Sequence, residues 1–222
     1  MDTNERFRDL TVDQFISLLA SGEPTPGGGA AAAVAGSLGG ALVAMVASLS
    51  VGRPKHADHE PLLVEAKAAG QELADRLLNL ADEDANAFAG FGVAMKMPRD
   101  TDEEKAARTA ALHSAARAAT EAPFRTVQAC LEVAAMAEAM AGRSNKNASS
   151  DLEVAGLMAV AAARAAAANV FVNLPAMGDE ALARDLLART EAIVDDVERL
   201  SSRTREVVRS GESRSPLSGG AA

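Results

Sequence analysis

Apolar residues recur at spacings of three and four through most of the chain, a pattern typical of amphipathic helices. The longest such run extends from about Pro61 to Met97, where Pro98 ends it, and the last begins near Asp179. Ala, Leu, Val and Met supply nearly all apolar positions, because aromatic residues make up only 3% of the sequence. This composition favours closely packed helices over sheets.

Capping boxes mark three helix starts. In each, a Ser or Thr is followed three residues later by Glu or Gln, so that the two side chains can satisfy free backbone N–H groups. The pairs are Thr11 with Gln14, Thr101 with Glu104, and Ser150 with Glu153. Pro123 is expected to kink or interrupt the helix that begins at Thr101.

The stretch PTPGGGAAAAVAGSLGGALVAMVASLS, from Pro24 to Ser50, predicts the central helix. It carries no charged residue, and about 20 such residues could cross a bilayer. Ala, Gly and Ser dominate the run, however, and contribute little insertion free energy, so we expect a buried helix of a soluble protein. Ala33, Gly36 and Gly40 share a face that a second backbone can approach closely, and this surplus of small residues predicts a homodimer.

Gly27, Gly28 and Gly29 follow Pro26 and form a turn into this helix. Glycines after proline commonly only end one element and begin the next. No Gly-Lys-Ser/Thr follows them and no hydrophobic strand precedes them, which disfavours a phosphate loop and a dinucleotide fold. Two interpretations stay open: a structural turn, or a helix start whose free N–H groups face an anionic ligand.

Asp84 lies on the apolar stripe of the long helix. At 100° per residue its direction is within about 20° of Leu73 and Phe91, whereas Asp82 points to the opposite side. Burying a carboxylate is costly unless it is paired or protonated. Spacing alone therefore leaves Asp84 either a structural link or an acid/base group poised for proton transfer.

Arg53, Lys55 and His56 form the most compact basic cluster, just after the central helix, where cations suit the helix dipole. A solvated helix cap is the simplest interpretation. An acidic protein that binds a polyanion also needs local cations, which makes Arg53 and Lys55 candidates for binding an anionic tail near the glycine turn. His56 and His59 are spaced like a metal pair, but no third ligand is evident, so we expect neither a metal nor a cofactor.

The formal net charge of −9 argues against binding to nucleic acid. Cys130 is the only cysteine, so no intramolecular disulfide can form, and the charged start is unlike a signal peptide. We therefore expect a cytoplasmic protein. We place one helical domain at residues 1–210, followed by a tail at 211–222 that lacks an apolar face and is expected to be disordered.

Several motifs, read in order, resemble the formiminotransferase-cyclodeaminase and methenyltetrahydrofolate cyclohydrolase family. They are PTPGGGAAAAVAGSLGGALVAMV, DEDANAF (82–88), MPRDTDEEKAARTAAL, SNKNASSDLEV and NVFVNL. The resemblance implies an all-α, up-and-down bundle of long helices, a homodimer, and folate one-carbon chemistry near the dimer interface.

The same resemblance implies roles for individual residues. Asp84 matches the catalytic acid/base of the family. Substrate contacts are implied for the glycine turn, the basic segment and an Asn-Ser-Asp loop: Pro26, Gly27, Gly28, Gly29, Arg53, Lys55, Asn147, Ser150 and Asp151. The chain departs from the family at Ser144, which replaces a glycine, and at Pro54 and His56, which replace a basic and an aromatic residue.

Two folate reactions follow from the resemblance. Hydrolysis of 5,10-methenyltetrahydrofolate to 10-formyltetrahydrofolate needs two proton transfers, which one carboxylic group of shifted pKa can perform. Cyclodeamination of 5-formiminotetrahydrofolate would use the same acid to protonate the departing ammonia. We favour hydrolysis because no transferase domain is fused here, and a non-catalytic helical scaffold is the third alternative. The expected partners are a folate, with or without a polyglutamate tail, and a second copy of the chain, but no membrane.

Overall fold

The structure is a computed structural model that describes residues 6–217. In that range every regular element is helical, which confirms the predicted all-α class. Four short 3-10 turns accompany the α-helices, which are α1 (Val12–Leu19), α2 (Gly28–Ser48), α3 (Glu60–Met95), α4 (Asp102–Met140), α5 (Ser149–Asn173) and α6 (Glu180–Ser210).

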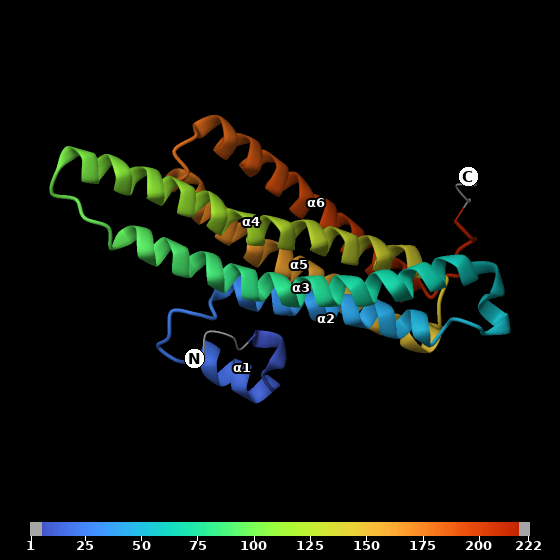
Figure 1. Ribbon diagram of the computed structural model, residues 1–222. Helices are drawn as coiled ribbons and strands as arrows, with labels where there is room; N and C mark the ends of the chain where they lie inside the picture. The colour runs from blue at the N-terminus through green and yellow to red at the C-terminus, as the bar shows by residue number, and fades with distance from the viewer. Residues whose placement is uncertain (1–5, 218–222) are drawn as a thin grey trace.

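The five long helices form an elongated up-and-down bundle (Figure 1). α2 packs against α3, α4 and α5, and α6 packs against α4 and α5. The α3–α4 hairpin projects beyond the other helices at one end, and the short α1 lies beside α2 (Figure 1). α2 therefore lies between its neighbours over most of its length, as expected for a central helix.

Glycines allow α2 and α3 to approach each other closely. A Cβ atom added to Gly70 would lie 2.7 Å from the Ala44 nitrogen and 2.8 Å from the Gly40 oxygen. On Gly36 it would meet the Cys130 Sγ at 3.2 Å. The small-residue face of α2 therefore packs against other helices of the same subunit, so it is not the dimer surface that the sequence suggested.

Two segments are long and apolar enough to cross a membrane by length and composition, namely α2 and Lys146–Ala176. In the bundle, 61% of an apolar 18-residue stretch of α2 is buried, and 44% of such a stretch in Lys146–Ala176 is buried. Ala30, Ala33, Val43, Val46 and Ala47 of α2 are fully covered by neighbouring helices. The apolar character of α2 is explained by its place in the core.

Helix boundaries agree with two of the three capping boxes. Both reciprocal hydrogen bonds form at Thr11 and at Thr101, but the third prediction is wrong. A 3-10 turn at Lys146–Ala148 leads directly into α5, so the helix already begins at Ser149 and Ser150 lies inside it. α4 continues through Pro123 from Asp102 to Met140, so the proline does not interrupt the helix.

The first part of the C-terminal segment is hydrogen-bonded to the rest of the fold. Gly211 ends α6 in the left-handed conformation, with φ 66°. The Arg214 N–H then donates to the Gly142 oxygen at 2.9 Å, and Arg143 Nε donates to the Ser215 oxygen at 2.6 Å. These hydrogen bonds hold this part of the tail without an apolar face, and disorder of the tail from residue 211 stays a prediction. Residues 218–222 lie outside the described range.

Candidate active site

Asp84 of α3 lies against the first turn of α2. A Cβ atom added to Gly29 would lie 2.5 Å from the Asp84 Cγ, which is far inside van der Waals contact. The carboxyl group therefore occupies the space that any other residue at position 29 would fill. Gly29 is itself buried, so this contact lies inside the protein.

The start of α2 is open to such a group because Gly27, its N-cap, has no side chain to cover the free N–H groups. Burial raises the pKa of Asp84 above its usual value, and a hydrogen bond from the Ala30 N–H partly opposes this rise. A carboxyl group held in this way can accept a proton and return it closer to neutral pH than an exposed aspartate can.

The three consecutive acids of α3 have different partners. Asp82 Oδ1 accepts a hydrogen bond from the Phe7 N–H at 2.8 Å, and Glu83 pairs with Arg125. Only Asp84 faces the glycine turn. The prediction that Asp82 and Asp84 point to opposite sides of the helix is confirmed.

Asn169 of α5 is a site residue that the sequence reasoning did not assign. A Cβ atom added to Gly28 would lie 3.7 Å from the Asn169 Nδ2, so the carboxamide lies beside the glycine turn. Asn173, one turn further on, donates through its Nδ2 to the Ala119 oxygen of α4 and to the Asn169 oxygen, each at 3.0 Å. The sequence pointed to these residues only through the motif NVFVNL and the spacing of its two asparagines.

Arg53 and Lys55 lie far from this turn within one subunit. Both are exposed and follow the C-terminal end of α2. The 21 residues of α2 separate them from Gly27 by roughly 30 Å at 1.5 Å per residue. The expectation that they lie near the glycine turn is wrong for a single chain, because an unbroken helix keeps its two ends apart.

The Asn-Ser-Asp loop lies at the same end of the bundle as Arg53 and Lys55. The Asn145 N–H donates to the Ser50 Oγ at 2.9 Å, which ties this loop to the C-terminal end of α2. Asn147 and Ser150 are exposed and Asp151 is partly buried. The candidate residues therefore form two groups. We call Pro26–Gly29, Asp84 and Asn169 the glycine end, and Arg53, Lys55, Asn147, Ser150 and Asp151 the basic end.

Within the described range, the two histidines of the basic segment belong to no group of three or more His, Cys, Asp or Glu side chains that could hold a metal ion. His56 is buried, and its Nε2 has no hydrogen-bond partner there. Burial lowers the pKa of His56, with smaller contributions from the charges of Lys55 and His59. His56 is therefore held neutral in the fold.

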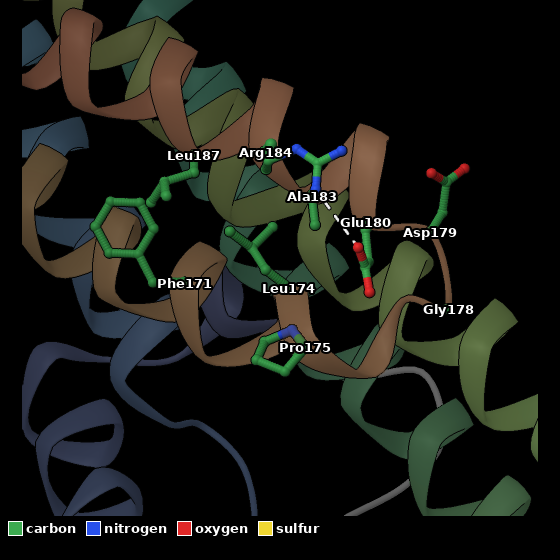
Figure 2. Close-up of a pocket in the computed structure, with 9 residues that line it drawn as sticks. All are labelled: Phe171, Leu174, Pro175, Gly178, Asp179, Glu180, Ala183, Arg184 and Leu187. Atoms are coloured by element: carbon green, nitrogen blue, oxygen red, sulfur yellow. Dashed lines mark hydrogen bonds and ion pairs between the residues drawn. The ribbon is translucent and has the colours of Figure 1, made fainter.

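A cavity of about 660 Å³ lies between the end of α5 and the start of α6 (Figure 2). Phe171, Leu174 and Leu187 provide apolar walls, and Arg184 and Glu180 pair with each other across 3.5 Å. Phe171 is two residues from Asn169 and so points to a different side of α5. This cavity does not include Asp84 or the glycine turn. Its two carboxylates have structural partners, because Asp179 accepts a hydrogen bond from the Leu182 N–H and Glu180 pairs with Arg184.

The fold and the glycine end define an all-α protein with a half-buried carboxyl group at a helix start. Residues 11–192 match the formiminotransferase-cyclodeaminase family, and the chain belongs to this family.

Similar proteins include enzymes of two names. The chain is 39% identical to a methenyltetrahydrofolate cyclohydrolase of Methylorubrum extorquens, over 90% of this chain and 96% of the relative. It is 31% identical to a formimidoyltransferase-cyclodeaminase of Gallus gallus, over 75% of this chain but only 31% of that longer protein. The crystal structure of a formiminotetrahydrofolate cyclodeaminase from Thermotoga maritima superimposes with a TM-score of 0.82 at 27% identity, covering 91% of this chain and 98% of that one.

Proposed function

We propose that the protein hydrolyses 5,10-methenyltetrahydrofolate to 10-formyltetrahydrofolate. The observation that carries this proposal is the buried carboxyl group of Asp84 against the uncapped start of α2, with its pKa raised by burial. The near full-length similarity to a cyclohydrolase supports the choice of reaction.

The reaction requires one group that takes up a proton and returns it. The water oxygen bonds to the carbon between N5 and N10 as one water proton passes to the Asp84 carboxylate. The carbon–N5 bond then breaks while N5 takes that proton from Asp84. The hydroxyl proton of the adduct leaves as the C=O bond forms, so one proton is released per substrate. General acid–base catalysis of this kind contributes roughly 10²–10⁴-fold to a rate.

Cyclodeamination of 5-formiminotetrahydrofolate is the second candidate, because the Thermotoga maritima relative carries that name and has the same fold. N10 would add to the formimino carbon, and Asp84 would protonate the nitrogen that departs as ammonia. Both reactions place proton transfer on oxygen or nitrogen atoms bonded to the same one-carbon centre, so Asp84 would serve either one.

We further propose that the protein works as a homodimer, in which the basic end of one copy meets the glycine end of the other. A shallow apolar groove on α2 and α5 supports this arrangement. It has a volume of about 490 Å³ and is lined by Leu38, Ala41, Leu42, Met45, Val154 and Met158. The side chain of Leu38, the middle residue of α2, is 56% exposed.

A two-fold axis that passes through this groove perpendicular to α2 would reverse the direction of α2 in the second copy. The C-terminal end of one α2 would then lie beside the N-terminal end of the other. Arg53 and Lys55 of one subunit could bind the anionic glutamate tail of a folate whose reacting carbon lies at Asp84 of the other. This arrangement would resolve the separation of roughly 30 Å found within one chain.

The assay that tests the reaction follows the absorbance of the methenyl substrate. The chain has no Trp and no Tyr, so its own absorbance interferes little. We expect the absorbance to fall on adding catalytic amounts of protein. Release of ammonia from the formimino substrate, with the methenyl substrate left intact, would instead establish cyclodeamination. Failure to turn over either substrate would favour the scaffold.

A further inference from the structure

Asp84 and Asn169 flank the glycine turn from two different helices. The Asp84 carboxyl group fills the position of a side chain on Gly29, and the Asn169 Nδ2 lies 3.7 Å from the position of a Cβ atom on Gly28. The Cα atoms of consecutive residues are about 3.8 Å apart. A small molecule that enters at the turn would therefore meet both groups.

The orientation of the Asn169 side chain is fixed by its own helix. Its Nδ2 donates to the Ala165 oxygen at 2.9 Å, and only the amide nitrogen can donate to a carbonyl. The Oδ1 is left as the group able to accept a further hydrogen bond. Asn173 holds this last part of α5 against α4 through the Ala119 oxygen, so the carboxamide is presented from a rigid support.

We propose that Asn169 is a second reactive-site residue, whose Oδ1 accepts a hydrogen bond from the water that adds to the one-carbon centre. This inference rests on the proposed function. Attacking water has two O–H bonds, and Asp84 takes the proton from only one of them. A neutral acceptor for the other O–H directs the oxygen lone pair at the carbon. In cyclodeamination the same atom would hold an N–H of the departing ammonia.

A neutral amide suits this position better than a second carboxylate. Two carboxylates in one site would raise the pKa of Asp84 further, since like charges disfavour ionisation. They would also stabilise the cationic substrate before reaction, which does not raise turnover. Gly28 contributes by lacking a side chain, so the amide stays accessible from the turn.

The test is Asn169→Ala, with Asn86→Ala as the matched control. Asn86 carries the same amide two residues from Asp84 but is exposed on another side of α3. We expect Asn169→Ala to lower kcat by roughly 10–100-fold while KM and the melting temperature change little, and the control to match wild type. Normal kcat in Asn169→Ala, an effect confined to KM, or a loss of activity that follows a loss of folding would overturn the proposal.

Asn169→Asp provides an independent readout. The aspartate keeps an acceptor but loses the N–H that bonds to the Ala165 oxygen, so well above the pKa of both acids its kcat should lie between those of Asn169→Ala and wild type. The acid limb of the pH profile should move to higher pH, because two carboxylates then share the site. An unchanged acid limb would count against the proposal. Wild-type protein inactive on both folates would instead refute the proposed function.

Discussion

The carboxyl group of Asp84 occupies the space of the side chain that Gly29 lacks. This contact joins residues far apart in the sequence and brings the titratable group to the uncapped start of α2. The absence of a side chain at Gly29 therefore makes room for this carboxyl group, in addition to allowing the turn that the glycine helps to form. Any side chain at position 29 must displace the carboxyl group.

Gly29→Ala tests this relationship. The added Cβ would collide with the Asp84 carboxyl, and a displacement of about 1 Å can cost roughly 10²-fold in rate. We expect kcat to fall by about that factor while the helical circular dichroism is retained. Gly22→Ala is the control, because Gly22 lies outside the glycine end and a Cβ there meets no atom within 4 Å, and its turnover should remain near normal. Equal effects of the two substitutions would contradict this account.

The pH dependence should follow the raised pKa of Asp84. As the pH falls, the carboxylate is protonated and can no longer take the proton of water, so kcat/KM should fall with an apparent pKa above the ordinary 3.8. The folded state binds this proton more tightly than the unfolded state does. The ionised group therefore lowers stability at neutral pH, and this penalty disappears as the pH falls through the folded pKa. A pH–rate profile whose acid limb lies at or below 3.8 would contradict the shift.

Much of this site follows from helical periodicity, and the rest does not. A rotation of 100° per residue correctly separated Asp84 from Asp82, because each helix face has one environment. Helical periodicity does not determine which helices pack against each other. The contact of Asp84 with Gly29 and the proposed role of Asn169 therefore follow only from the three-dimensional structure. The separation of the two ends of α2, in contrast, can be predicted from the length of the helix. The expectation that Arg53 lies near the glycine turn did not take this length into account.

Leu38→Arg tests the proposed interface. The substitution places a charge at the centre of the apolar groove of α2 and α5, where an isologous contact would bury two copies of it. We expect light scattering to change from about twice the chain mass of 22.7 kDa to the chain mass itself. Val93→Arg is a suitable control, since Val93 is 70% exposed on α3, outside this groove. Wild-type protein that is monomeric at every concentration would refute the dimer.

Replacing both Arg53 and Lys55 by Ala tests the basic end. These exposed side chains lie outside the region of Asp84, so folding and proton transfer should be kept. We expect KM to rise several-fold for a polyglutamylated substrate and less for the monoglutamate, because the additional carboxylates lose their cations. The double substitution Arg203→Ala and Arg205→Ala on exposed sites of α6 provides the control for charge alone. Equal increases of KM for both substrates would refute tail binding.

Asp84→Asn tests the central claim most directly. The amide keeps the shape of the carboxyl group but removes the proton that is transferred, so kcat should fall by roughly two to four orders of magnitude with the fold intact. Asp82→Asn is the control: its carboxylate only accepts the hydrogen bond from Phe7 at 2.8 Å, and turnover should remain close to wild type. Near-normal turnover by Asp84→Asn, together with early melting, would show that the buried carboxyl group is a structural link and not the proton-transfer group.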